Sequence, residues 1–195
     1  MRARKAVRAD AQRNIDSLLE AAKSVFAEQG VDAPSKAIAD QAGVGVGTVY
    51  RHFPQRSDLV KAVFQREVDA CAATAPVLAA AHAPGDALTK WLFRFTGFVA
   101  TKRGLARALH SGDPAYESLP GYFMDHLGPA LTSLLEVAAE AGEIRGDVAA
   151  KELLHAVAYL CAGPEGPAFS QRMVALLVEG LRYGAEGKTR KRPSR

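Results

Sequence analysis

Residues 43–53 read GVGVGTVYRHF: three glycines, at positions 43, 45 and 47, are followed at once by aromatic and basic side chains. A glycine inside a helix lowers helix stability by about 1 kcal/mol relative to alanine. A helix in this stretch therefore requires another interaction or a function that offsets this loss. Gly45 suits the N-cap position, where glycine costs only tenths of a kcal/mol against the best caps. Gly47 then falls in the first turn, where the missing side chain lets backbone approach a partner closely. The stretch therefore predicts a short helix over 46–53 that contacts another molecule.

The preceding residues, SKAIADQA at 35–42, predict a second short helix. Gly43 suits a left-handed turn between the two helices because it has no Cβ. Apolar residues of both helices are expected to pack the pair together: Ile38, Ala39, Ala42, Val44 and Val49. We therefore predict a helix-turn-helix at about residues 34–53, whose second helix can enter a DNA major groove about 12 Å wide.

Apolar residues at three- and four-residue spacing continue on both sides of this motif. They predict helices over 15–29, from about 57 to 68, and over 131–141, 148–161 and 170–183. Prolines and glycines between Ser111 and Pro129 predict loop and broken helix there. The predicted fold class is all-α, with a three-helix helix-turn-helix DNA-binding domain over 10–56. A larger helical domain for ligand binding and dimerisation, with about nine helices, follows over 57–184, and residues 1–9 and 185–195 are predicted to be basic, flexible termini.

The charge of the chain, +4 in all, is unevenly distributed. Residues 1–66 carry 11 Lys or Arg and 7 Asp or Glu, whereas residues 67–183 carry 9 and 13. A basic front end on a mildly acidic body favours a polyanionic partner for the front end; ordinary solvated charge is the alternative.

The composition also excludes some classes of protein. The two cysteines, Cys71 and Cys161, lie too far apart in sequence for a metal-binding pair and are typical of small core residues in a reducing compartment. No apolar run approaches the roughly 20 residues that a membrane span needs. We expect a cytoplasmic, nucleoid-associated protein without a membrane partner.

Side chains of the second short helix and its neighbourhood carry the chemistry for binding DNA. Thr48 offers a hydroxyl and a methyl group, Tyr50 and His52 offer donors for phosphate oxygens, and Arg51 adds fixed charge. Arg56 begins the next helix, where its charge and the helix N-terminus both favour phosphate. A tight helical corner with incidental basic residues is the alternative. The basic residues before the first helix, Arg2, Arg4, Lys5 and Arg8, can reach phosphates or the minor groove, or only raise solubility.

Residues 12–64 resemble the amino-terminal DNA-binding domain of the tetracycline-repressor (TetR) family of bacterial regulators. The signature is AIADQAGVGVGTVYRHFPQRSDLVKAVF, preceded by a helix that ends in AAKSVFAEQG. The connection VDAPSK is one residue shorter than the family's commonest form, and Arg56 stands where lysine is usual. Together with the residues above, the resemblance implies a set of DNA-binding positions: Ser35, Lys36, Gly45, Val46, Gly47, Thr48, Tyr50, Arg51, His52 and Arg56.

The stretches TKRGLARALH and AGEIRGDVAAKELL resemble a subgroup with an SbtR-like carboxy-terminal domain. The resemblance implies a domain that binds a small ligand of unknown identity and dimerises, with no cofactor. A mainly apolar pocket is expected among five aromatic residues: Trp91, Phe95, Phe98, Tyr122 and Phe123. The expected polar anchors beside it are Arg107, His110 and His126. The alternative is that these aromatic side chains fill the core.

The last two helices are apolar enough to bury one face in the body and another in a second copy. The residues predicted for dimerisation are Leu153, Leu154, Val157, Leu160, Val174, Leu177, Val178 and Leu181. A two-fold dimer would set two recognition helices about 34–36 Å apart, which matches a palindromic operator in double-stranded DNA.

The predicted function is that of a transcriptional regulator, a repressor released from its operator when ligand binds. A regulator without a small-molecule effector, controlled by a protein partner, is the alternative. An enzyme is disfavoured, because no nucleophile–base pair or phosphate-binding loop stands out. His110, Asp113, Asp125 and His126 have no fixed metal-ligand spacing.

Overall fold

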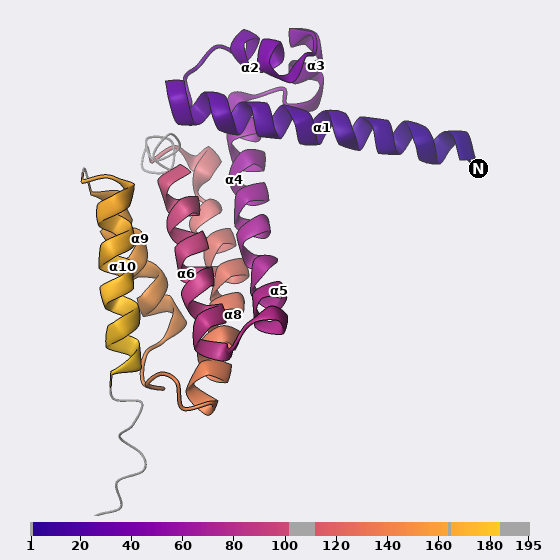
Figure 1. The fold of residues 1–195 in the computed structure, drawn as a ribbon. Coiled ribbons are helices and arrows are strands. Elements are labelled where there is room, and N and C mark those ends of the chain that lie inside the picture. The colour runs from indigo at the N-terminus through magenta and orange to yellow at the C-terminus, as the bar shows by residue number, and fades with distance from the viewer. Residues whose placement is uncertain (1, 102–111, 164, 184–195) are drawn as a thin grey trace, which may run out of the picture. The chain divides into compact units, whose positions relative to one another are not determined.

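The computed structural model describes residues 2–101, 112–163 and 165–183, and these contain helices and turns but no strand. The α-helices are α1 (Arg2–Gln29), α2 (Ser35–Ala42), α3 (Val46–His52), α4 (Arg56–Ala72), α5 (Thr74–Ala81), α6 (Pro84–Thr101), α8 (Leu119–Glu140), α9 (Ala150–Ala162) and α10 (Pro167–Arg182), and a 3-10 turn, η1, covers Pro114–Tyr116 (Figure 1). The all-α prediction is confirmed. None of the described helices combines the length and the apolar character that crossing a membrane requires.

Contacts divide the chain into two compact units. The first unit comprises Met1–Arg66 with Thr101–Pro120, and the second comprises Glu67–Ala100 with Gly121–Arg195. The division differs from the boundary predicted at residue 56, because the first part of α4 packs Leu59, Val60 and Val63 into the core of the first unit.

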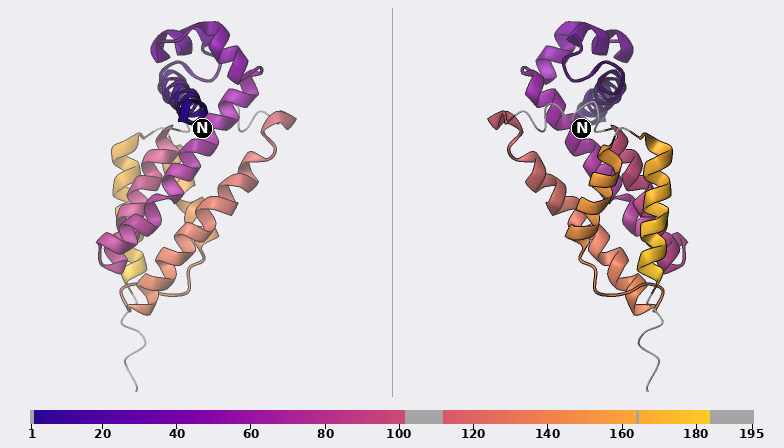
Figure 2. Two further views of the ribbon diagram at one scale, coloured as in Figure 1. Left: turned by 90° about the vertical axis from the view of Figure 1, so that its right-hand side faces the viewer. Right: turned by 90° about the vertical axis from the view of Figure 1, so that its left-hand side faces the viewer.

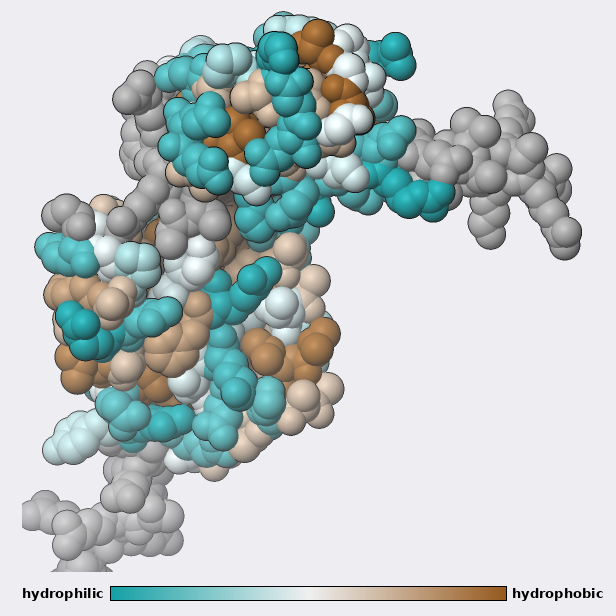
Figure 3. Space-filling view, turned by 45° about the horizontal axis from the view of Figure 1, so that its top comes forward, coloured by the Kyte–Doolittle hydropathy of each residue, from teal (hydrophilic) through white to brown (hydrophobic). Residues whose placement is uncertain are grey.

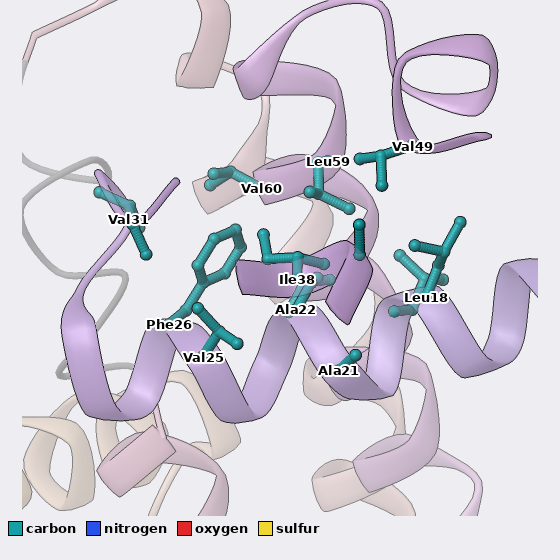
Figure 4. Packing of buried hydrophobic residues seen from close by; sticks show 14 residues of the cluster. Leu18, Ala21, Ala22, Val25, Phe26, Val31, Ile38, Val49, Leu59 and Val60 are labelled. Carbon is teal, nitrogen blue, oxygen red and sulfur yellow. The ribbon is translucent and has the colours of Figure 1, made fainter. Parts of the chain in front are cut away.

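The core of the first unit is a single cluster of buried apolar side chains (Figure 4). The apolar stripe of α1 contributes Leu18, Ala22, Val25 and Phe26, which recur at helical spacing and face Ile38 of α2. Gly30 ends α1 with φ +82° and donates its N–H to the Phe26 carbonyl at 3.0 Å. The cluster fixes α2 and α3 on one side of α1.

The second unit contains the larger helices of the carboxy-terminal half. Helices α9 and α10 lie side by side and run in opposite directions (Figures 1 and 2). The prediction of loop and broken helix up to Pro129 is wrong after residue 118, because α8 runs unbroken from Leu119 to Glu140. Pro120 stands at the second helical position, where no intrahelical N–H bond is lost. Pro129 lies inside the helix and removes one such bond, and a stripe of fully buried residues, Leu119, Leu127 and Leu131, offsets that loss.

Candidate nucleic-acid interface

The turn between α2 and α3 is fixed by backbone hydrogen bonds. Gly43 has φ +68° and ψ +29°, the left-handed conformation that only glycine adopts without strain. Its N–H donates to the Asp40 carbonyl at 3.3 Å, and the Val44 N–H donates to the Ala39 carbonyl at 3.0 Å. This pair of bonds is a Schellman motif, and Val44 packs against the core beside it. The predicted turn is confirmed.

Helix α3 begins and ends at residues that suit its short length. Gly45 is the extended N-cap residue, as predicted, and its carbonyl accepts the Thr48 N–H at 2.8 Å. Val49, only 2% exposed, anchors the helix in the core of the first unit. The Phe53 N–H closes the helix on the Val49 carbonyl at 2.8 Å, and its ring packs against the same core. One face of α3 is therefore held rigidly, and the opposite face is free.

The free face of α3 carries the residues predicted for DNA contact. Tyr50 is 55% exposed, Val46 is 43% exposed, and Arg51 is exposed as well. Thr48 and His52 are half-buried at the edges of this face. Figure 3 shows hydrophobic patches among hydrophilic side chains on the upper part of the molecule, where the first unit faces the viewer.

The glycines of α3 leave its backbone accessible. Gly45 and Gly47 are both exposed, and a Cβ added at either position would meet nothing within 4 Å. No neighbour within the chain therefore requires glycine at these two positions. The backbone at the start of α3 is therefore exposed to solvent, and another molecule can approach it closely.

The two predicted contact residues of α2 lie at its amino end. Ser35 is half-buried, and Lys36 is exposed and forms an ion pair with Asp40 at 2.6 Å, one helical turn onward. A phosphate near Lys36 would compete with this carboxylate in an exposed setting, where ion pairs contribute little.

The side chain of Arg56, predicted to face phosphate, points into the protein instead. Its Nε donates to the Val31 carbonyl at 2.6 Å, its Nη2 donates to the Ala33 carbonyl, and its guanidinium lies over the Phe26 ring. The side chain therefore points to the connection between α1 and α2, because two carbonyls and an aromatic face there satisfy the cation.

Comparison with known proteins identifies this architecture. The family described as "Bacterial regulatory proteins, tetR family" matches residues 18–63, which contain α2, α3 and the core that holds them. The domain described as "Transcriptional regulator SbtR-like, C-terminal domain" matches residues 83–183, more than half of the chain. The chain belongs to the TetR family. Members of this family are DNA-binding transcriptional regulators and not enzymes, as the sequence predicts.

Individual relatives of this TetR-family regulator agree with the assignment. A TetR transcriptional regulator from Streptomyces coelicolor is 37% identical, with a TM-score of 0.71 over 86% of this chain and 97% of that one. A TetR transcription regulatory protein from Mycobacterium vanbaalenii is 36% identical, with a TM-score of 0.69 over 90% and 99%. An HTH-type transcriptional regulator of Staphylococcus aureus (strain USA300) is 44% identical over 64 residues, which are 32% of this chain. The match spans about a third of the length of the curated relatives (35%).

The aromatic residues predicted to line a pocket pack against one another in the second unit. Trp91 stacks on Phe95 with ring centroids 5.7 Å apart, and Phe98 and Phe123 lie 6.2 Å apart beside them. Trp91 Nε1 also donates to the Cys71 carbonyl at 3.2 Å. All four rings are buried. These contacts join the four rings into one buried aromatic cluster. Arg107 and His110, also predicted to line the pocket, lie outside the described residues.

Tyr122 and His126 form a separate polar cluster with Asp69 of α4. The Tyr122 hydroxyl donates to Asp69 Oδ1 at 2.7 Å, and burial together with this bond raises the pKa of Tyr122 to about 12. His126 stacks on Tyr122 at 3.9 Å, and its Nε2 lies 3.8 Å from Asp69 Oδ1. Sequence reasoning missed Asp69, because its partners lie more than 50 residues away. Within the described residues, no group of His, Cys, Asp and Glu is suited to hold a metal ion.

The predicted dimerisation residues divide into two sets. Leu160 and Leu177 are half-buried, whereas six are buried inside the chain: Leu153, Leu154, Val157, Val174, Val178 and Leu181. The buried six pack α9 and α10 into their own unit and are not available to a partner. The exposed apolar residues of the two helices are instead Tyr159 and Leu176, 80% and 64% exposed.

Two open grooves lie on the second unit. One, of about 360 Å³, lies between α9 and α10 and includes Ala156, Leu176 and Leu177 in its lining. The other, of about 540 Å³, lies where α8 meets the start of α9 and includes Thr132, Glu136 and Ala150. Arg145, which forms a two-point ion pair with Asp147 at 2.5 and 2.6 Å, borders both grooves.

Proposed function

We propose that this TetR-family regulator binds a palindromic operator as a homodimer, with α3 in the major groove. The observation that carries the proposal is the free face of α3, where bare glycine backbone adjoins exposed Tyr50 and Arg51 while buried Val49 fixes the helix. Tyr50 and Arg51 are suited to phosphate oxygens, and Val46 and Thr48 to base edges such as the thymine methyl. Few side chains of α3 read bases, so DNA shape contributes to specificity.

A homodimer would present two such helices to one face of the duplex. We assign the dimer contact to the exposed side of α9 and α10, around Tyr159, Leu160, Leu176 and Leu177. Leu176 and Leu177 line the apolar groove between α9 and α10, and Tyr159 of α9 is 80% exposed. Exposed apolar side chains on neighbouring helices favour a binding surface. The six buried leucines and valines support this surface from within.

The regulated step is operator release, for which two controls are candidates. A small, mainly apolar effector in the second unit would change the spacing of the recognition helices; coupling of this kind is typically worth about 1–3 kcal/mol. The chain shares its fold with a gamma-butyrolactone receptor, at 21% identity and a TM-score of 0.64. The rings of Trp91, Phe95, Phe98 and Phe123 contact one another, so an effector would bind by separating them or beside them. Control by a protein partner without a small-molecule effector is the second candidate.

Selection of bound DNA from a random pool tests the proposal. We expect the enriched sequences to contain a palindrome whose half-sites lie about one helical turn apart. Tyr50→Ala should then weaken binding to that palindrome, whereas Tyr183→Ala, at an exposed tyrosine just after α10, should not. Enrichment of no symmetric site would refute the palindromic operator and the homodimer, and equal affinity of the two variants would refute the assignment of α3. Adding metabolite extracts or candidate partner proteins to the same binding assay distinguishes the two controls.

A further inference from the structure

Arg56 is enclosed at the first residue of α4. Its Nε lies 2.6 Å from the Val31 carbonyl oxygen, its Nη2 donates to the Ala33 carbonyl, and its guanidinium carbon lies 4.9 Å from the centroid of the Phe26 ring. A guanidinium is well suited to this environment, because it is flat, carries several donors in a fixed fork and stacks on aromatic faces. Three separate segments, the end of α1, the connection after it and the start of α4, therefore meet at one side chain.

The same side chain is poorly placed to reach a phosphate. Its Nη1 is enclosed and has no hydrogen-bond partner among the described residues. Burial lowers the pKa of Arg56, and the nearby Asp32 carboxylate acts in the opposite direction. An outward turn would cost two charge-assisted hydrogen bonds and would leave two carbonyl oxygens without their donor.

The two carbonyls belong to the segment that sets the start of α2. Gly30 opens this connection in the left-handed region, and the Ala33 N–H donates to the Gly30 carbonyl at 3.2 Å. Val31 and Ala33 point their side chains into the core. Pro34 follows, and its carbonyl accepts the Ala37 N–H of the first turn of α2 at 2.9 Å. A shift of this connection would therefore move the amino end of α2.

We propose that Arg56 is a positioning residue that clamps the α1–α2 connection and so holds the amino end of α2 against DNA, instead of a residue that binds phosphate. The proposal rests on the proposed function, in which α2 and α3 face DNA. The guanidinium supplies a separate nitrogen to each of the two carbonyls and a flat face to the Phe26 ring, whereas a lysine would offer one nitrogen to both carbonyls and no flat face.

The salt dependence of operator binding distinguishes a clamp from a phosphate ligand. The slope of log K against log salt changes by about 0.9 for each phosphate contact that is lost. We expect Arg56→Gln to weaken binding by about tenfold or more with an unchanged slope, because the phosphate contacts remain but α2 is misplaced. Arg51→Gln, at an exposed arginine of α3, is the matched variant and should reduce the slope. Hydrogen exchange of the amides in residues 30–37 should become faster in Arg56→Gln and stay unchanged in Arg51→Gln.

Arg56→Lys is the second variant, and it provides the test if Arg56→Gln fails to fold. The lysine retains the charge, so a phosphate ligand would keep its affinity and slope, whereas a clamp would lose affinity at the same slope and exchange faster at 30–37. A smaller slope in Arg56→Gln, or full affinity and unchanged exchange in Arg56→Lys, would overturn the inference. The proposed function fails separately, if the wild-type protein selects no operator at all.

Discussion

Replacing Gly47 with alanine should make the protein more stable and a weaker DNA binder. Gly47 is the second residue of α3, it is exposed, and an added Cβ would meet nothing within 4 Å. Alanine therefore gains helix propensity without a clash, which is worth about 0.5–1 kcal/mol of unfolding free energy. That gain corresponds to a rise of about 1–4 °C in Tm for a chain of this size.

The added methyl group occupies the surface where we place the DNA. We expect operator affinity to fall by about tenfold, or about 1.4 kcal/mol, because the backbone of α3 can no longer approach as closely. Urea unfolding and fluorescence anisotropy with labelled operator measure the two effects on one preparation. Unchanged affinity in a stabilised variant would refute the close approach of backbone to DNA, and a loss of stability would refute the helical assignment of Gly47.

Gly43→Ala is the control, because it should lower the unfolding free energy that Gly47→Ala raises. Gly43 also has open space around its Cβ position, but its φ is +68°. An alanine in the left-handed region costs about 1–2 kcal/mol, and the reduced freedom of the unfolded chain returns part of that cost. We expect a net loss of about 1 kcal/mol in unfolding free energy. A gain in stability here would mean that the turn is not left-handed.

Three further predictions concern the second unit. Leu127→Ala should cost about 2–5 kcal/mol in urea unfolding, because Leu127 is fully buried in α8; a cost below about 1 kcal/mol would show that α8 is not packed there. Leu176→Asp should shift the protein from dimer to monomer in sedimentation, whereas Val77→Asp, at an equally exposed valine of α5, should not; a monomeric wild type would contradict the assigned dimer surface. Burial raises the pKa of Cys71 from an ordinary value of 9.0 to about 12, so its thiol should resist alkylation at about pH 9 until the protein unfolds. Because the folded pKa is the higher one, the associated stability is fully present below pH 9.0 and is lost as pH rises toward about 12. A fast reaction of the folded protein would refute this burial.

Local sequence signals predicted the helix-turn-helix of α2 and α3 closely. The bounds of α2, the left-handed Gly43 and the N-cap Gly45 all agree with the structure, because each depends on residues within one or two turns of the chain. The same reasoning failed for α8, where Pro120, Gly121, Gly128 and Pro129 suggested a break. A stripe of leucine and phenylalanine packed against other helices outweighed those local preferences, and such packing is not visible in neighbouring residues.

Long-range contacts limited the prediction of individual site residues. Arg56 was expected to face phosphate on the basis of its charge and position, but it reaches carbonyls more than 20 residues earlier in the chain. Likewise, periodicity identified α9 and α10 as apolar without showing which side each leucine faces. Tyr116, in the turn η1, packs against the core of the first unit, a contact that its sequence neighbours do not suggest.

The brevity of α3 has a genetic consequence. A helix of seven residues is far below the length of about 12–15 at which an isolated peptide helix becomes even marginally stable, so α3 persists only because Val49 and its neighbours hold it in the core. A screen for mutants that lose control of a reporter gene should thus recover interior substitutions, at Leu18, Phe26 or Ile38, alongside those on the exposed face. Such a screen would therefore identify residues that support α3 from within the core as often as residues on the face that we propose contacts DNA.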